Sequence, residues 1–298
     1  MRVFITGASG WIGSATVDEL LAAGHEVVGL ARSEASSRSL AAKGAEVRRG
    51  DLDDLKSLRA GADDAEAVIH LANKHDFDDP AASNQAERAA VEAIGAVLAG
   101  SGRPFLLASG TAGLAPGREA TEHDRSPFSG PDAPRGGSES LALDFVDRGV
   151  HTVSLRFAPT VHGDGDHGFI AALVGVARNR GSAGYVGDGT NRWSAVHRLD
   201  AARLVRLGLE KAPAGALLHA VGENAVRARE IAEAIGRGLD LPAVSVPTED
   251  VAEHFGWIGA IFAMDIPASS TLTRELVGWS PTGPTLLDDL DSGSYFQR

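Results

Sequence analysis

The sequence predicts an α/β fold with a doubly wound parallel sheet, followed by a smaller C-terminal part. Three observations predict this fold. Short apolar runs alternate with segments of helical spacing up to Phe157, as parallel strands joined by helices do. The first apolar run leads into a turn with glycine at every third position. Beyond Phe157, glycine-rich loops interrupt the alternation.

The first strand and its turn are the most informative stretch of the chain. Residues 3–5 form an apolar run that is too short for a helix, and residues 6–13 read TGASGWIG. The next helix is expected at residues 14–23. Glycines let a backbone turn tightly and approach a pyrophosphate, whose charge the N-terminus of the helix stabilises. Because glycine spacing is a weak signal on its own, a tight turn without a ligand is the alternative.

The alternation of strands and helices continues to Phe157. Apolar runs predict strands at residues 3–5, 27–31, 67–71, 104–108 and 152–157, and a further strand is predicted at residues 46–49. Helical spacing predicts helices at residues 14–23, 36–43, 55–60, 86–99 and 138–147. These six strands with helices between them form a doubly wound sheet. We therefore expect residues 1–157 to form a dinucleotide-binding domain.

Residues 158–298 are expected to pack directly on the first part, because no low-complexity linker separates the two. Glycine-rich loops occupy residues 163–168 and 181–189. Helices are expected at residues 169–179, 200–210 and 228–238, a strand at 216–221, a short edge element at 245–247 and two helices within 271–290. One apolar cluster is interpreted as core rather than as pocket lining. Its members are Phe255, Trp257, Ile258, Ile261, Phe262 and Met264.

Composition and charge exclude several classes of function. The net charge of -12 repels nucleic acids and anionic membranes. The absence of cysteine excludes disulfides, thiolate nucleophiles and cysteine metal sites. The nearest candidate for a membrane span, residues 255–264, is half the length that a span requires. We therefore expect a cytoplasmic protein with a small-molecule substrate and with no nucleic-acid or membrane partner; a homodimer stays open.

Six motifs in order carry a resemblance to a known group of enzymes. They are TGASGWIG at residues 6–13, GDL at 50–52, VIHLA at 68–72, Ser109 after the fifth strand, RFAPTVHG at 156–163 and VHRLD at 196–200. In this order they resemble the extended and atypical short-chain dehydrogenase/reductase superfamily, which contains the NAD-dependent epimerases and dehydratases. The resemblance covers almost the whole chain. It implies a Rossmann-type fold whose C-terminal part binds the substrate.

The resemblance also implies which residues bind a dinucleotide. Most lie in the glycine-rich turn or follow the carboxyl ends of strands: Gly7, Ser9, Gly10, Trp11, Ile12, Gly13, Arg32, Ser33, Asp51, Leu52, Leu71, Ala72, Asn73, Pro159 and Val161. Asp51 and Leu52 would contact the adenine, although an ordinary turn residue is the alternative for Asp51. Pro159 and Val161 would pass beside the nicotinamide.

The end of the second strand predicts which dinucleotide binds. A site for NAD carries a carboxylate there, which accepts hydrogen bonds from the ribose hydroxyls. This chain has Ala31, followed by Arg32 and Ser33. A guanidinium and a hydroxyl suit a 2′-phosphate, so NADP is predicted and NAD is the weaker candidate. The alternative for Arg32 is a solvated surface charge.

The catalytic signature is where the chain departs from its relatives. They carry Tyr-x-x-x-Lys on the helix after the fifth strand, where the lysine lowers the pKa of the tyrosine. The only tyrosines here are Tyr185 and Tyr295, and counting places Pro131 and Arg135 at the two positions. Arg135 could hold the nicotinamide ribose, but an arginine stays charged and cannot act as a general acid or base.

Hydroxyls and imidazoles are the remaining candidates for catalysis. Ser109 and Thr111 match the hydroxyl position that binds a substrate carbonyl, with hydrogen bonding inside a turn as the alternative. Four loop histidines could transfer protons, although a structural role is the alternative for each: His75, His162, His167 and His197. The two histidines and two aspartates of residues 162–167 do not predict a metal site, because a glycine-rich loop has no fixed spacing that brings ligands together.

We interpret the sequence as an NADP-dependent oxidoreductase that acts on a carbonyl or hydroxyl group of a small organic molecule. Two other functions share these motifs. One is an epimerase or dehydratase, against which the missing tyrosine counts. The other is a non-catalytic NADP-binding sensor, which would not need the tyrosine and lysine.

Overall fold

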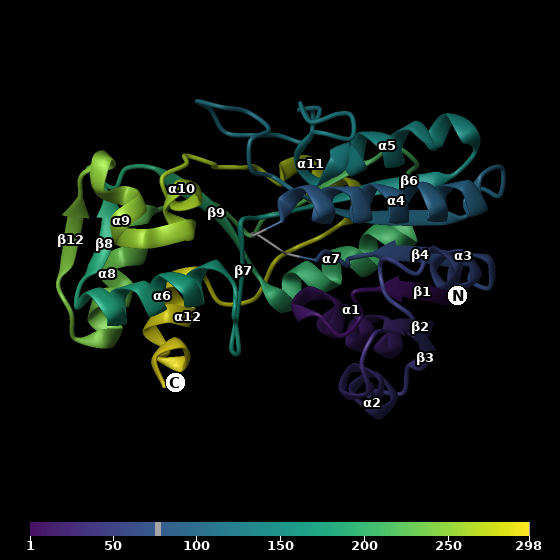
Figure 1. Ribbon diagram of the computed structural model, residues 1–298, viewed down its shortest axis with the longest axis horizontal. Coiled ribbons are helices and arrows are strands. Elements are labelled where there is room, and N and C mark those ends of the chain that lie inside the picture. Colours follow the sequence, from purple (N-terminus) through teal and green to yellow (C-terminus); the bar gives the residue numbers. More distant parts are fainter. Residues whose placement is uncertain (75–78, 298) are drawn as a thin grey trace.

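A seven-stranded parallel sheet forms the core of the computed structural model, which describes residues 1–74 and 79–297 (Figure 1). Its strand order is β10-β6-β5-β4-β1-β2-β3. The strands are β1 (Arg2–Thr6), β2 (Glu26–Ala31), β3 (Glu46–Arg49), β4 (Ala67–His70), β5 (Pro104–Gly110), β6 (His151–Phe157) and β10 (Leu217–Ala220). The order reverses between β1 and β4, and such a reversal leaves a crevice for ligands at the carboxyl ends of the strands. The predicted fold class is confirmed.

Helices cover both faces of this sheet, so its strands are apolar on both sides. Buried side chains of α1 (Trp11–Ala22), α2 (Glu34–Ala42) and α7 (Arg198–Lys211) share one core with Val3 and Ile5. A second core contains Phe4 and Phe105 together with buried side chains of three other helices: α3 (Leu55–Asp63), α4 (Pro80–Leu98) and α5 (Ser138–Asp144). The short helices η1 (Pro134–Gly137) and η2 (Val146–Arg148) flank α5, and α11 (Thr271–Val277) adds Val277 to the first core.

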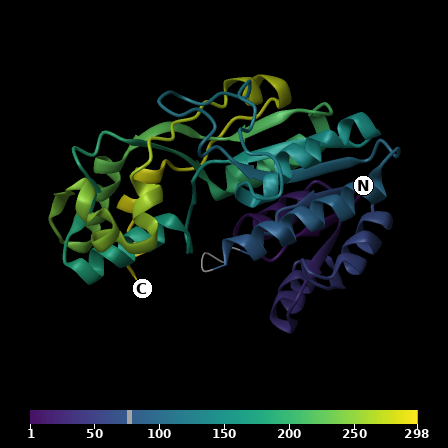
Figure 2. The same cartoon turned by 45° about the horizontal axis from the view of Figure 1, so that its top comes forward.

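A second lobe has its own core and lies at the other end of the molecule (Figures 1 and 2). It contains a three-stranded sheet, β11-β9-β7, and a two-stranded sheet, β12-β8. The strands are β7 (Thr160–His162), β8 (Ala183–Val186), β9 (Arg192–His197), β11 (Glu223–Arg227) and β12 (Ala243–Val246). The helices are α6 (Phe169–Arg180), α8 (Ala228–Leu239), η3 (Thr248–Asp250), α9 (Val251–Phe255), η4 (Gly256–Ile258), α10 (Gly259–Phe262), α12 (Leu286–Asp291) and η5 (Ser294–Phe296).

Three sequence predictions need correction. The first helix begins at Trp11 rather than at residue 14, because the glycine-rich turn closes with Gly10 donating to the carbonyl of Gly7. The main sheet has seven strands rather than six, since β10 joins its edge beside β6. The stretches that form β7, β8, β9 and β11 were not predicted as strands, because they are short and carry polar side chains or glycine.

The boundary expected at residue 157 stays a prediction. Beyond it, β10 and α7 still pack with the seven-stranded sheet, while the other elements named for the second lobe build that lobe. The apolar cluster of residues 255–264 divides by exposure: Phe255, Ile258 and Phe262 are buried, whereas Trp257 and Met264 are exposed. No helix in the described ranges is long and apolar enough to span a membrane.

Candidate functional site

The glycine-rich turn between β1 and α1 has the shape of an anion cradle. Gly7 has a φ of 70°, and a Cβ there would lie 2.7 Å from the backbone nitrogen of Ala72. A Cβ on Gly13 would overlap the carbonyl oxygen of Gly7. Gly10 is exposed and forms the N-cap of α1, where glycine has no side chain that could cap the first turn. Free N–H groups at a helix N-terminus bind phosphate, and this turn therefore fits a pyrophosphate.

Trp11 ties this turn to the second half of the chain. Its indole nitrogen donates to the carbonyl of Val161 at 2.6 Å. The guanidinium of Arg198 lies 4.1 Å from the Trp11 ring, and its Nε donates to the Trp11 carbonyl at 2.6 Å. The ring of His167 meets the Trp11 ring edge-on at 5.6 Å. The Trp11 side chain therefore has a structural role, which leaves its backbone as the part that could face a dinucleotide.

At the end of β2, the structure shows an exposed cation and a helix cap. Arg32 is exposed, and Ser33 is the N-cap of α2, where its hydroxyl accepts from the backbone of Ser36 at 3.1 Å. The last residue of β2 is the buried Ala31, which has no carboxylate. Asp51 accepts from the backbone nitrogens of residues 53 and 54, at 2.9 and 3.0 Å. These bonds favour the turn interpretation for one oxygen of Asp51. Leu52 is buried.

A carboxylate that the sequence analysis missed lies beside the end of β4. Glu87 of α4 is fully buried, and its two oxygens accept from Arg135 at 2.6 Å and from the Asn73 amide at 2.8 Å. It therefore links the predicted cation to a residue just after β4. The signal was present, because Glu87 shares a helix face with Ala90 and Val91, which are apolar and buried.

Arg135 has an unusual backbone. Its φ of 55° and ψ of 25° are left-handed, and Gly136 and Gly137 follow with φ of 62° each. Residues with a Cβ rarely adopt this conformation. The carbonyl of Gly136 accepts from Arg88 of α4 at 2.9 Å. Two contacts with α4, one from the Arg135 side chain and one from the Gly136 carbonyl, thus hold this segment in place.

His70 lies at the end of β4, next to this pair. Its Nδ1 lies 2.8 Å from the Thr6 hydroxyl, and its ring is fully buried. Burial lowers the pKa of His70; the Glu87 carboxylate opposes that shift, and Arg135 adds to it. The imidazole is therefore neutral at pH 7 and is a structural partner of β1.

Ser109 and Thr111 differ in their surroundings: Ser109 is the second-last residue of β5, and Thr111 follows the strand. Thr111 is buried; its backbone nitrogen donates to the carbonyl of Phe157 at 3.0 Å, and its hydroxyl lies 3.4 Å from that of Ser194. These contacts favour the structural interpretation of Thr111. Ser109 is half-buried at the carboxyl end of β5, and its hydroxyl has no hydrogen-bond partner within residues 1–74 and 79–297. Ser109 is thus the hydroxyl that can meet a substrate.

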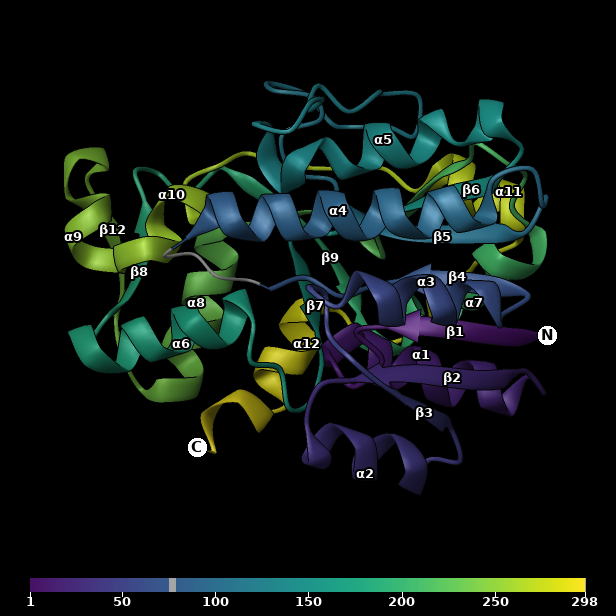
Figure 3. The same cartoon turned by 45° about the vertical axis from the view of Figure 1, so that its right-hand side comes forward.

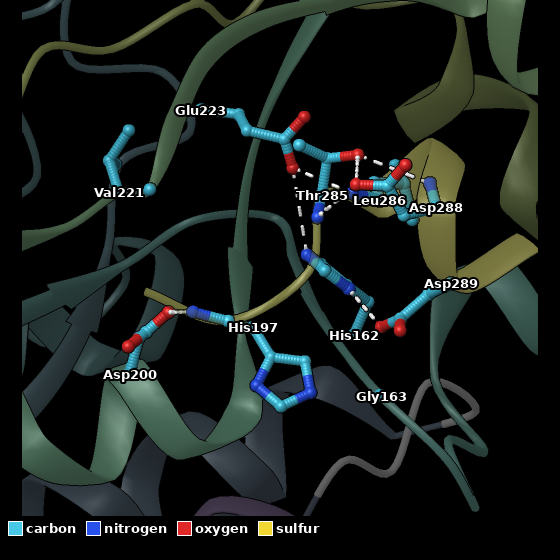
Figure 4. Close-up of polar contacts among 12 residues, drawn as sticks. His162, Gly163, His197, Asp200, Val221, Glu223, Thr285, Leu286, Asp288 and Asp289 are labelled. Atoms are coloured by element: carbon cyan, nitrogen blue, oxygen red, sulfur yellow. Dashed lines mark hydrogen bonds and ion pairs between the residues drawn. The ribbon is translucent and has the colours of Figure 1, made fainter. Parts of the chain in front are cut away.

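Of the loop histidines that the structure describes, His162 and His197 contact each other, whereas His167 contacts Trp11. His162 is fully buried, with Nδ1 2.6 Å from Asp289 and Nε2 3.7 Å from Glu223 (Figure 4). Burial lowers the pKa of His162, but the hydrogen bond to Asp289 and the nearby Glu223 carboxylate outweigh burial, and the net shift is upward. His162 therefore joins β7 to α12 and β11 through the carboxylates of Asp289 and Glu223.

The other loop histidines have separate surroundings. His197 caps α7 and meets the His162 ring edge-on at 5.6 Å, and burial lowers the pKa of His197. His167 is exposed apart from its contact with Trp11. His75 lies outside the described residues. Within the described ranges, no group of three or more histidine, aspartate or glutamate side chains is arranged to hold a metal ion.

Both tyrosines serve the second lobe. The hydroxyl of Tyr295 donates to Asp166 at 2.8 Å and accepts from the backbone of Gly163 at 3.3 Å. Burial raises the pKa of Tyr295 far above its usual range. Tyr185 lies on β8 under the guanidinium of Arg229. These contacts tie the C-terminus to the loop after β7 and leave neither hydroxyl as an obvious proton donor.

Comparison with known proteins places this geometry in context. The sequence profile of the NAD dependent epimerase/dehydratase family matches residues 3–219. An uncharacterized protein of Schizosaccharomyces pombe is 46% identical over 99% of this chain and 100% of its own length. An uncharacterized protein of Saccharomyces cerevisiae is 43% identical over 97% of this chain and 98% of its own length. A ketoreductase of Stigmatella aurantiaca, which acts on a farnesylated dihydroquinoline oxide, is 29% identical over 72% of this chain and 66% of its own.

Solved structures share the fold at low identity. The UDP-glucose 4-epimerase of Thermotoga maritima has a TM-score of 0.76 and 18% identity, over 100% of this chain and 99% of its own. The dTDP-glucose 4,6-dehydratase of Streptomyces venezuelae, solved with NAD and TYD bound, has a TM-score of 0.76 and 20% identity, over 100% of this chain and 97% of its own. At this identity the likeness concerns the fold.

Proposed function

Because the chain belongs to the NAD dependent epimerase/dehydratase family, we propose that it is an NADP-dependent oxidoreductase acting on a carbonyl or hydroxyl group of a small organic molecule. The observation that carries the proposal is the Arg135–Glu87 pair next to Asn73, close to the turn that fits a pyrophosphate. The relationship to a ketoreductase supports the same reaction type.

The preference for NADP rests on the end of β2. Arg32 is exposed there and no carboxylate stands at position 31. A guanidinium contact to a phosphate contributes about 1.5 to 3 kcal/mol, which corresponds to a tenfold or larger preference. The hydroxyl of Ser33 already caps α2, so Arg32 supplies most of the expected discrimination.

The chain's own residues then act on the substrate oxygen. When bound, the nicotinamide supplies or accepts a hydride. Arg135 stays protonated at any working pH, and a fixed cation stabilises negative charge that develops on the substrate oxygen. Glu87 holds the guanidinium, and Ser109 offers a second hydrogen-bond donor. A proton then comes from water or from an exposed imidazole such as His167, because His162 is buried in an ion pair.

Cofactor titration and turnover test this function together. We expect NADPH to bind at least tenfold more tightly than NADH, and Arg32→Ala to remove most of that difference. Arg59→Ala, an exposed arginine on α3, is the matched control and should change neither affinity. Equal affinity of the wild type for both cofactors would refute the NADP preference.

Turnover separates the three candidate functions. NADPH consumption with a panel of aldehydes and ketones supports the oxidoreductase. Conversion of a sugar nucleotide without net change of cofactor would identify an epimerase or dehydratase instead. Tight NADPH binding with no turnover of either kind would leave the sensor function.

A further inference from the structure

Two exposed arginines lie at the carboxyl ends of β2 and β3, the two strands at one edge of the main sheet. Arg32 follows Ala31, the last residue of β2, and Arg49 is the last residue of β3. Ala31 and Arg49 are paired in the register of the two strands. Figure 3 shows α2 beside β2 and β3, on which this helix packs. Both arginines therefore lie where the chain passes from the sheet edge to α2.

The side chain of Arg49 reaches from β3 to the first turn of α2. Its Nη1 donates to the Ser37 hydroxyl at 2.6 Å and lies 3.5 Å from the Glu34 carboxylate. The Ser37 hydroxyl in turn donates to the carbonyl of Ser33 at 2.9 Å. Ser33 is the N-cap of α2 and directly follows Arg32. These contacts bring the Arg49 guanidinium to the same turn of the chain that begins at Arg32.

The charges at this turn favour a dianion. Among the described residues, none forms an ion pair with Arg32. The ion pair of Arg49 with Glu34 joins side chains that are 56% and 70% exposed, and such an exposed pair contributes little to stability. A phosphate monoester carries nearly two negative charges at neutral pH and forms charge-assisted hydrogen bonds with guanidinium groups. It can therefore replace Glu34 as the partner of Arg49.

Arg48, the neighbour of Arg49 on β3, has different surroundings. Successive side chains of a strand point to opposite faces of the sheet, and Arg48 forms an ion pair with Asp64 at the end of α3. It carries the same charge on the same strand, but its partner is on another helix. Arg48 is therefore a matched control for Arg49.

From this arrangement we infer that Arg49 is a second residue that selects the dinucleotide, because it binds the 2′-phosphate of NADP together with Arg32. This inference rests on the NADP preference of the proposed function, since a Rossmann-type fold places the adenosine ribose at the carboxyl end of β2. Arg32 stays the main contact, and Arg49 adds a second guanidinium from the neighbouring strand. A 3′-phosphate on the same ribose has the same chemistry, so the experiment compares the two positions.

Calorimetric titration with adenosine fragments tests the inference without turnover. We expect the wild type to bind adenosine 2′,5′-bisphosphate about tenfold or more tightly than adenosine 5′-monophosphate, and Arg49→Ala to lower this ratio about threefold or more. The affinity for the monophosphate should stay unchanged, since it lacks the second phosphate. Arg49→Gln, which can keep the hydrogen bond to Ser37 without the charge, should show the same loss. Arg48→Ala should leave the ratio unchanged, and Glu34→Gln should raise it, because it removes the competing carboxylate.

The outcomes separate this inference from the proposed function. If both Arg49 variants keep the wild-type ratio while Arg32→Ala loses it, the inference is overturned and the NADP preference stands. A wild type that binds the bisphosphate no more tightly than the monophosphate, or not at all, refutes the NADP preference and the inference together. Tighter binding of adenosine 3′,5′-bisphosphate than of the 2′,5′-isomer also overturns the inference. Thermal unfolding of each variant confirms that a loss of affinity is not a loss of fold.

Discussion

Arg135 combines a strained backbone with a charge that is held in place. A left-handed conformation costs a residue with a Cβ roughly 1 to 2 kcal/mol, and the two glycines that follow adopt the same conformation without that cost. An arginine at such a position implies that its side chain offsets the strain or serves function. Its contact with a fully buried Glu87 fits both.

At this scale we predict that Arg135→Gly lowers turnover by about 10², as the loss of one donor to a developing oxyanion does. Glycine also relieves the left-handed strain, so Arg135→Ala should be less stable than Arg135→Gly by about 1 kcal/mol. Steady-state kinetics and chemical denaturation of both variants measure the two effects.

The double variant Glu87→Gln/Arg135→Gly is the control for this prediction. Removing Arg135 alone leaves a buried carboxylate without its cation, and the glutamine removes that charge. The double variant should therefore recover stability relative to Arg135→Gly but not turnover. Full turnover in Arg135→Gly would show that the pair is only structural.

At the scale of elements, apolar runs were the reliable signal. β1, β2, β4, β5 and β6 are buried on both faces, so they read as short apolar runs in the sequence. β9 and β11 carry arginine, serine, histidine or glutamate; they pair with each other, and β9 also pairs with β7. Their strands depend on contacts between distant segments, which a local pattern does not contain.

The local parts of the candidate site could be predicted from the sequence, whereas its contacts between distant segments could not. The glycine-rich turn is local, and its geometry follows from the residues that form it. The partners of Arg135 and His162 lie 48 and 127 residues away along the chain, on α4 and α12. The apolar neighbours of Glu87 on its helix indicate that its side chain is buried, but nothing local identifies its partner, since most charged residues face solvent.

The glycine-rich turn gives the prediction for an element. Gly10 is exposed, and a Cβ there would meet only the carbonyl oxygen of Gly7, at 3.1 Å. Gly10→Val should therefore fold, yet lose NADPH affinity by at least tenfold, because the side chain occupies the space for the pyrophosphate. Calorimetric titration and thermal unfolding measure both properties.

Gly13→Val is the contrasting variant. Its Cβ would overlap the Gly7 carbonyl, so the turn itself must shift and the melting temperature should fall as well. NADPH binding that Gly10→Val leaves intact would mean that the turn has no ligand.

At the scale of the whole molecule, the segment after α11 holds the parts together. Asp200 of α7 is buried and accepts from the backbone nitrogens of Thr282 and Gly283, at 3.0 and 2.7 Å (Figure 4). Farther on, Asp289 of α12 meets His162 of β7, and Glu223 of β11 accepts from the backbone of Leu286. This segment therefore contacts both lobes.

His162 predicts how stability depends on pH. Its pKa is raised on folding, so its contribution is complete below the unfolded value of about 6.5 and is lost as pH rises through the folded value. We expect His162→Gln to lower the free energy of unfolding by about 3 kcal/mol at pH 6, and by less at alkaline pH. Urea denaturation of the wild type and the variant across this pH range measures the difference.

The test compares the free energy of unfolding of the wild type with that of His162→Gln, because other histidines change stability with pH in the opposite direction. Burial lowers the pKa of His70, His197, His219 and His254, so their contributions are lost as pH falls. The contributions of His70, His219 and His254 cancel when the variant is subtracted from the wild type, whereas that of His197 does not, because His162 contributes to its pKa shift. The titratable groups that face His162 from adjoining elements are Asp289, Glu223, His197 and Asp166. A destabilisation by His162→Gln that grows with pH would contradict a raised pKa of His162.

The return of the chain to form β10 has a consequence for synthesis. Residues 158–216 add no strand to the main sheet, although α7 packs on it, and the strand that pairs with β6 at the edge, residues 217–220, comes only after them. While a ribosome is still translating the intervening segment, the nascent chain presents β6 as an open apolar edge, and such edges pair readily with other chains. The main sheet is therefore completed late in synthesis. Until then, the exposed edge of β6 is a surface to which a chaperone, or a second nascent chain, can bind.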